Sequence, residues 1–353
     1  MSRNINCDNP LRAVVHVPLV PAKAGTQGQE KKDLDSRLRG NERIVHWCIF
    51  DVGDKVMRKS TRPDGERQDG AAGARDRLAS ALEERFGEPV AIPSDISDVS
   101  ALAPFALHAV CRRYGDRALD RDLVRLLCAC ALSAPSKSDL QQRDIVEVTD
   151  PDIRRRIAAL MPHMPWVGAA PGFLVFCANG RRLPRIAALR AKPFPNDHLD
   201  LFFNAVADAA IALSSCVHAA ESIGLGCCPI SEIRNHATEL SDWLGLPERV
   251  IPFAGLCIGW PSDAGRITPN ITPRLPLSLT LHENRYDETG FETTVAAYDA
   301  RREAINPYGS QRDTDRWGVS TDYGWSEDKA RQYSKPLRVE FGRFVRARGF
   351  NLD

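Results

Sequence analysis

Hydrophobic and polar residues follow regular periods from Ala74 onwards, and this pattern predicts the secondary structure. Apolar side chains recur at helical spacing in residues 74–87 and 119–134, where Gly87 suits a helix end and Asp120 suits an N-cap. The same reasoning predicts a helix followed by a loop at 98–113, and further helices at 150–161, 199–224, 236–247 and within 290–350.

Four apolar segments without helical spacing are predicted strands. Residues 172–179 (GFLVFCAN) and 250–260 (VIPFAGLCIGW) are continuous rather than alternating, which is typical of strands covered on both faces. Residues 143–150 form a shorter strand, and 227–234 form a strand that passes into a turn. Strands and helices alternate without an internal repeat, so the class is α+β or α/β with helices flanking one sheet. The helix at 199–224 is apolar on nearly every face and belongs at the centre of a domain or an oligomer.

Residues 1–72 differ from this pattern because they are polar, charged and rich in glycine. Such a segment buries too little apolar surface to offset its chain entropy. We therefore expect 1–72 to be a disordered or spurious N-terminal extension, and 73–353 to form the folded domain with a C-terminal helical arm. Residues 21–41 resemble a translated bacterial intergenic repeat, which makes Met57 a candidate start; a regulatory tail is the alternative.

Composition excludes several classes of protein. The 353 residues carry a formal net charge of +1, so no global basic bias indicates nucleic-acid binding. The longest apolar run, AVADAAIALSSCV, contains Asp208 and is shorter than the ~20 residues needed to span a bilayer. The ten cysteines contain no C-x-x-C pair and the eight histidines show no ligand spacing, so we expect reduced thiols in the cytoplasm and no metal site.

Three separated segments carry the candidate chemistry. SAPSKSDLQQ (133–142) is unusually polar for a turn between a helix and a strand, and Pro135 ends the helix before it. HAVCRRYGDR (108–117) and TPRLP (272–276) carry arginines beside breaks in regular structure. Arginine suits phosphate because its planar fork donates two parallel hydrogen bonds. Taken singly, each segment is equally compatible with a phosphate site and with a solvated surface loop.

The order of these segments and of three further motifs resembles the FMN-dependent nitroreductase family, in its NADPH-dependent flavin reductase and oxygen-insensitive nitroreductase branch. The resemblance begins at His108, where the family has an H-R-S-x-R segment, and continues through the serine-rich turn to about Phe350. The motifs that follow in family order are AAESIGLG (219–226), GLCIGWP (255–261), TPRLP (272–276) and HENRY (282–286).

The chain departs from the family pattern at three places. The inner Arg-Ser pair of H-R-S-x-R is Ala109 and Val110 here, while the outer His108 and Arg112 remain. A turn that is usually glycine-rich carries Ser231 and Glu232, and a frequent lysine before the Pro-Arg of TPRLP is Thr272. These departures leave open how tightly the phosphate is held and which reductant is used.

The resemblance implies a mixed sheet flanked by helices, built as an intertwined homodimer with FMN at the interface. It also implies hydride transfer from NAD(P)H through the flavin to a nitroaromatic, quinone or flavin acceptor by a ping-pong mechanism, with no catalytic side chain and no metal. The cofactor-binding residues implied are His108, Arg112, Ser136, Ser138, Gln141, Trp166, Pro229, Ile230, Ser231, Glu232 and Arg274.

The polar segment 306–320 stands where this branch binds the 2′-phosphate of NADPH. Tyr308 occupies about the position of the branch's key arginine, and Arg312 and Arg316 are the nearby candidates. Other readings remain open: a flavin enzyme of the same fold with dehalogenating or flavin-fragmenting chemistry, a non-catalytic flavin sensor, or an interaction protein with a degenerate site. We expect a cytoplasmic protein that binds neither nucleic acid nor membrane.

Overall fold

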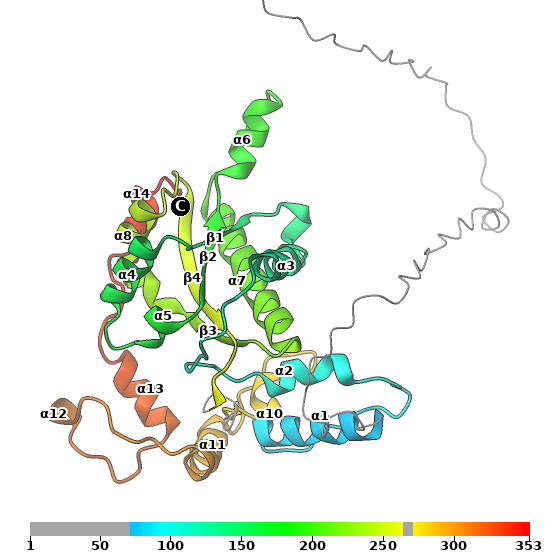
Figure 1. Cartoon of the computed structure of the whole chain (residues 1–353). Helices are drawn as coiled ribbons and strands as arrows, with labels where there is room; N and C mark the ends of the chain where they lie inside the picture. The colour runs from blue at the N-terminus through cyan, green and yellow to red at the C-terminus, as the bar shows by residue number, and fades with distance from the viewer. Residues whose placement is uncertain (1–70, 264–270) are drawn as a thin grey trace, which may run out of the picture. The chain divides into compact units, whose positions relative to one another are not determined.

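The structure is a computed structural model that describes residues 71–263 and 271–353 (Figure 1). The expectations for residues 1–70, including the intergenic repeat and the start at Met57, lie outside the described residues. The strands are β1 (Arg143–Glu147), β2 (Gly172–Asn179), β3 (Gly226–Ile230) and β4 (Val250–Gly259).

Helices precede, connect and follow these strands. Those before and between the strands are α1 (Ala71–Phe86), α2 (Ala103–Leu107), α3 (Arg121–Leu132), α4 (Pro151–Leu160), α5 (Trp166–Ala169), α6 (Arg182–Leu189), α7 (Leu199–Ser222) and α8 (Ala237–Trp243). The C-terminal helices are α10 (Leu277–Thr280), α11 (Phe291–Ile305), α12 (Thr314–Trp317), α13 (Trp325–Tyr333) and α14 (Phe341–Ala347). Short 3₁₀ turns lie at η1 (Ser100–Leu102), η2 (Lys137–Asp139) and η3 (Ser231–His236).

The sheet has the strand order β1-β2-β4-β3, and its three strand pairs are antiparallel. One parallel pairing is added at its edge, where Val110 bridges to Cys227 of β3. Helices cover both faces, with α3 and α7 on one side and α4, α5 and α8 on the other (Figure 1). Successive β2 residues therefore enter different cores, Phe173 towards α4 and α5 and Leu174 towards α7. This double covering explains the continuous apolar sequence of β2 and confirms the α+β class.

Most predicted elements are present in the structure. β2 has the predicted bounds, Asp120 caps α3 by accepting hydrogen bonds from the Asp122 and Leu123 amides, and α7 ends two residues before Gly224. The φ of Gly224 is +86°, a conformation that favours glycine. Helix α6 was not predicted; it is only eight residues long and none of its residues is buried.

Helix α7 is the central helix of the fold. By length and composition it is the one helix within the described residues that could cross a bilayer. It packs instead along β2 and α3, and buries the polar residues Asn204 and Asp208. A buried charge on a core helix requires partners, and these determine how the neighbouring turn is built.

Asp208 is 1% exposed and holds the turn that follows α3. Its carboxylate accepts hydrogen bonds from the Ser136 hydroxyl (2.7 Å), the Lys137 amide (3.2 Å) and the Gln142 amide (2.8 Å). The buried guanidinium of Arg143 lies 3.4 Å away and also donates to the carbonyls of Leu132 and Ala134. One carboxylate therefore joins α7, the end of α3 and the start of β1.

We predict that Asp208→Asn lowers the free energy of unfolding by about 3–5 kcal/mol, because it leaves Arg143 buried without its counter-ion. Urea unfolding at fixed protein concentration measures the change. Asp200→Asn, at an exposed position on the same helix, is the control and should cost less than about 1 kcal/mol. Equal stability of the two variants would show that the network contributes little.

Candidate functional site

The segment that begins at His108 lies beside the edge strand of the sheet. The Cys111 amide donates to the Cys227 carbonyl at 2.8 Å, next to the parallel bridge between Val110 and Cys227. The close approach needs a glycine in β3, since a Cβ on Gly226 would lie 2.5 Å from the Cys111 side chain. This packing explains why the motif AAESIGLG ends in glycine.

Arg112 follows this pairing and lies over an aromatic ring. Its guanidinium carbon is 5.2 Å from the centre of the Trp166 ring, and its positive charge acts on the thiol of Cys228. The Trp166 Nε1 atom is buried without a hydrogen-bond partner. Burial raises the pKa of the Cys111 and Cys228 thiols, so both stay neutral near pH 7 and neither is an activated nucleophile.

The turn after β3 lies beside Arg112. The parallel bridge pairs Val110 with Cys227, and the same register places Arg112 beside Pro229. Pro229 and Ser231 are exposed there, and Ile230 is buried in the core beneath. Glu232 pairs with His163 of the segment between α4 and α5, with 3.1 Å between Oε1 and Nε2. The structure thus brings Arg112, Trp166 and residues 229–232 together at one edge of the sheet.

Arg85 joins His108 to the TPRLP motif. This residue of α1 is 5% exposed and donates hydrogen bonds to the carbonyls of Ala106, His108 (2.6 Å) and Thr272 (3.0 Å). In return, the Arg274 amide donates to the Arg85 carbonyl at 2.7 Å. Burial lowers the pKa of Arg85, and the nearby charge of Arg274 lowers it further. Arg85, His108 and Arg274 define a candidate anion-binding corner, where the carboxylates of Glu84 and Glu221 also act on the charge of Arg85.

A cleft of about 730 Å³ extends from Arg274 towards the C-terminal arm. Among its lining residues are Arg302 of α11, Tyr308, Arg312 and Lys329. Arg302 lies 4.2 Å above the Tyr308 ring, and both Arg302 Nε and the Tyr308 hydroxyl are buried without partners. Arg312 donates to Asp328 at 2.8 Å. Arg316 lies on α12 over Trp317 and does not line this cleft.

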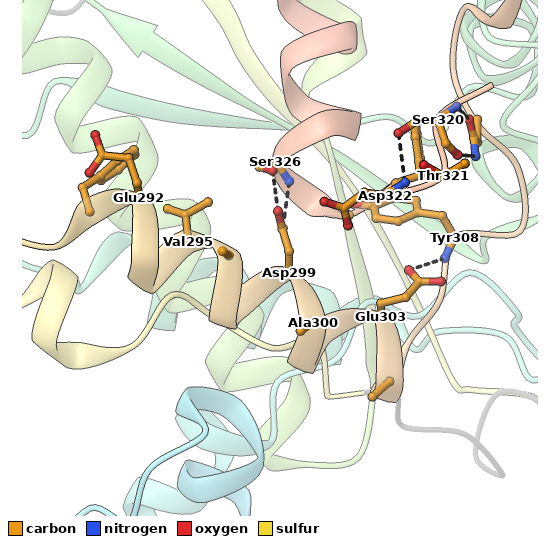
Figure 2. A pocket seen from close by; sticks show the side chains of 16 residues that line it. Glu292, Val295, Asp299, Ala300, Glu303, Tyr308, Ser320, Thr321, Asp322 and Ser326 are labelled. Atoms are coloured by element: carbon orange, nitrogen blue, oxygen red, sulfur yellow. Dashed lines mark hydrogen bonds between the residues drawn. The ribbon is translucent and has the colours of Figure 1, made fainter. Parts of the chain in front are cut away.

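Tyr308 also borders a second cleft, which has the opposite charge. Figure 2 shows α11 facing the segment 320–326 across it, and Asp299 there accepts hydrogen bonds from the amide and hydroxyl of Ser326. The acidic residues that line this second cleft are Glu292, Asp299, Glu303 and Asp322. This negative lining disfavours a phosphate, whereas the cleft on the Arg274 side of Tyr308 is lined by several arginines.

The serine-rich turn is strained and tightly held. Ser138, Asp139 and Gln141 all have left-handed backbones, with φ of 50°, 56° and 52°. Non-glycine residues adopt this conformation at a cost, and such strain gathers at functional sites. Against expectation, the Ser136 hydroxyl is not free: it donates to Asp208 and accepts from the Gln141 amide at 2.7 Å. Ser138 and the Gln141 side chain are exposed.

The predicted site residues fall into two groups along α7. Ser136 is anchored at Asp208, whereas His108 contacts Glu221 near the other end of the helix. These two anchors are thirteen residues apart, which corresponds to about 20 Å at ~1.5 Å per helical residue. The chain therefore brings Arg112, Trp166 and 229–232 together, connects His108 to Arg274 through Arg85, and places Ser136, Ser138 and Gln141 elsewhere.

Sequence reasoning missed Arg85, Glu221 and Arg302. Glu221 lies inside the motif AAESIGLG and Arg85 lies in the helix predicted at 74–87, but neither pattern indicates a role. Arg85 and its partner Thr272 are far apart in the chain, so no local pattern reveals their contact. Within residues 71–263 and 271–353, no group of three or more His, Cys, Asp or Glu side chains is placed to hold a metal ion.

Comparison with known proteins identifies the family. Residues 109–260 match the nitroreductase family and residues 272–353 match the C-terminal domain of the nitroreductase family. The chain is 30% identical over 250 residues to an FMN reductase [NAD(P)H] of Bacillus subtilis, covering 70% of this chain and 96% of that protein. It is 34% identical over 214 residues to an oxygen-insensitive NADPH nitroreductase of Salmonella typhimurium, covering 60% and 84%.

Solved structures agree with this relationship. B. megaterium NfrA2 matches with a TM-score of 0.63 and 30% identity, over 72% of this chain and 98% of that one. The NADPH:FMN oxidoreductase from Vibrio harveyi complexed with NAD⁺ matches with a TM-score of 0.60 and 27% identity, over 70% and 97%. The chain belongs to the nitroreductase family.

We predict that Arg85→Lys loosens the anion-binding corner, because a lysine keeps the charge but cannot donate to three carbonyls from one planar fork. The melting temperature should fall by several degrees, and amide hydrogen exchange should rise in 106–112 and 271–276.

Arg75→Lys is the matched control for this prediction. Arg75 also lies on α1 and also donates to carbonyls, those of Ile92, Pro93 and Ile96, away from the corner. Arg75→Lys should leave amide hydrogen exchange in 271–276 unchanged. If amide hydrogen exchange in 271–276 were also unchanged in Arg85→Lys, Arg85 would not be the residue that holds the TPRLP motif in place.

Proposed function

We propose that the protein is an FMN-dependent oxidoreductase that passes hydride from NAD(P)H to nitroaromatic, quinone or flavin acceptors. The observation that carries this proposal is the anion-binding corner, where the guanidinium of Arg85 joins the exposed Arg274 to His108. A phosphate would bind there through Arg274. The donor set fits the flavin cofactor, because Arg112 over Trp166 and the turn 229–232 lie along the same edge of the sheet.

FMN, when bound, supplies the hydride chemistry, and the chain's residues hold it in place. Arg274, His108 and Arg112 would hold the phosphate. Ile230, Ser231 and Glu232, with Pro229 at the start of their turn, would border the ring. Trp166 would exclude water beside Arg112. No protein nucleophile takes part, and we expect ping-pong kinetics, since donor and acceptor use the same place in turn.

A second copy of the chain completes the site. Leu199, Phe203 and Ile211 are 51%, 66% and 38% exposed and recur at helical spacing along α7, beside the exposed Leu126 and Leu132 of α3. Such an apolar surface favours a partner. In a homodimer the partner's Ser136, Ser138 and Gln141 are free to reach the flavin, which the separation of about 20 Å prevents within one chain.

The remaining assignments are part of the same proposal. Residues 73–353 form the flavin-binding domain with its C-terminal arm, and 1–72 are an extension that it does not need. The protein works in the cytoplasm on small molecules, without membrane or nucleic-acid partners. A non-catalytic flavin sensor is the second candidate, favoured by the Glu232–His163 pair in a turn that is usually glycine-rich.

An absorption spectrum of the purified protein, recorded before and after anaerobic addition of NADPH, tests the function. We expect flavin bands that bleach. Bands that persist with both NADPH and NADH would favour the sensor. Absence of bands after incubation with FMN would overturn the proposal.

We predict that Arg112→Ala and Arg274→Ala each weaken FMN binding by roughly 10–150-fold, because each removes a charge-assisted contact worth about 1.5–3 kcal/mol. Quenching of flavin fluorescence measures the affinity. Arg155→Ala, which removes an exposed arginine of α4, is the control and should bind FMN normally. Normal affinity in either test variant would take that arginine out of the site.

We further propose that the cleft beyond Arg274 binds the 2′-phosphate of NADPH. Arg312 lines it, together with Arg302 and Lys329, whereas Arg316 is outside. Although both arginines were candidates, this placement favours Arg312. Arg302 stands over Tyr308, where the resemblance leads us to expect an arginine, and its unpartnered Nε suits an anion.

We predict that Arg312→Ala lowers kcat/KM for NADPH about tenfold and leaves the value for NADH unchanged, because only NADPH carries the 2′-phosphate. Arg316→Ala is the matched control from the same segment and should change neither value. Melting temperatures exclude unfolding, since Arg312 also pairs with Asp328. An equal loss with both nicotinamides, or a loss confined to Arg316→Ala, would contradict the assignment.

A further inference from the structure

A cavity of about 490 Å³ is lined by the serine-rich turn after α3, by α6 with the turn that follows it, and by the start of α7. Ligand sites in proteins commonly have volumes of roughly 300–1,000 Å³, so this cavity has room for a small molecule. Asn204 lines it and precedes Glu221, the partner of His108, by seventeen residues on α7, which corresponds to about 25 Å at ~1.5 Å per helical residue. The cavity is therefore separate from the anion-binding corner.

The lining of this cavity has more positive than negative residues. Three cationic residues line it, and none of them forms an ion pair with another described residue: Lys137, Arg190 and Lys192. The one carboxylate in the lining, that of Asp200, accepts a hydrogen bond from the Asn204 side chain at 2.7 Å. The turn that carries Arg190 and Lys192 is closed by a hydrogen bond of 2.9 Å from the Lys192 amide to the Ala187 carbonyl. This lining favours an anionic ligand.

Gln142 supplies a buried acceptor at the same cavity. It is 0% exposed and lines the cavity, and its Oε1 atom has no hydrogen-bond partner among the described residues. Its Nε2 atom donates to the Leu201 carbonyl at 3.4 Å. The main chain of Gln142 is fixed, because its amide donates to Asp208 and its carbonyl accepts from the Asn179 amide at 2.9 Å. Buried polar atoms are nearly always hydrogen-bonded, so Oε1 lacks a donor that a ligand can supply.

We propose that this cavity binds a small aromatic carboxylate that also carries a hydroxyl group. The carboxylate pairs with the cations of the lining, the ring packs against Phe194, Leu140 and Leu183, and the hydroxyl donates to Oε1 of Gln142. An inorganic anion would leave the apolar lining and Oε1 unused, and a neutral aromatic would leave the cations unpaired. The inference goes beyond the proposed function and does not require a flavin, because none of these groups belongs to the anion-binding corner.

Three probes test the charge and the hydroxyl separately. Titration calorimetry of the full chain, with excess FMN to occupy the anion-binding corner, measures their dissociation constants. The probe para-hydroxybenzoate has both groups, its methyl ester lacks the charge, and para-methoxybenzoate lacks the donor. We expect para-hydroxybenzoate to bind about fivefold more tightly than each of the other two, because each comparison removes one polar contact.

Variants place the ligand in this cavity. Arg190→Gln combined with Lys192→Gln should weaken para-hydroxybenzoate roughly tenfold and leave the methyl ester unchanged, because the ester does not use the charge. Arg185→Gln is the matched control, since Arg185 is an exposed arginine of α6 that lines a different cavity, and it should change neither value. Gln142→Met should remove the preference for para-hydroxybenzoate over para-methoxybenzoate. If Gln142→Met does not fold, the exposed double variant still tests the site.

Several results would overturn the inference. Wild-type protein that binds neither para-hydroxybenzoate nor its meta isomer has no such site. Equal affinity for para-hydroxybenzoate and its methyl ester would remove the role of the cations. Unchanged affinity in the double variant, or an equal loss in Arg185→Gln, would place the ligand outside this cavity. Flavin bands that persist with NADPH count against the proposed function alone, so the two failures are distinguishable.

Discussion

The buried carboxylate of Asp208 is the interaction on which the rest of the structure depends. It lies on the central helix, and its partners are the turn after α3 and the first residues of β1. Since a buried charge must be satisfied, this requirement fixes three elements against one another. It also keeps Ser138, Asp139 and Gln141 in left-handed conformations that an unsupported turn would leave.

Arg85 plays the corresponding role at the other end of α7 with the opposite charge. It satisfies its donors with backbone carbonyls rather than with a carboxylate, so its positive charge remains available to a ligand. A buried carboxylate thus shapes one half of the proposed flavin site, and a buried guanidinium shapes the other. The two halves are anchored about 20 Å apart on α7, too far apart to meet around one flavin within a single chain.

At two positions where the chain departs from the family pattern, an arginine from another element lies close by. The segment after His108 lacks an Arg-Ser pair, yet the guanidinium of Arg85 lies beside the His108 carbonyl. Tyr308 stands in place of an expected arginine, yet Arg302 lies over its ring. In both cases an arginine from another element lies nearby.

Local sequence determined the elements of this protein, and tertiary structure decided its site. The continuous run of β2, the Asp120 cap and the glycine after α7 were predictable because period and capping depend on neighbouring residues. The family resemblance also named Arg112, Trp166 and the turn 229–232 as candidates, and they lie together at one edge of the sheet. Strand order, the use of the Ser136 hydroxyl by Asp208, and the contacts of Arg85 and Glu221 were not predictable. Each depends on a contact between residues far apart in the chain, which folding alone brings together.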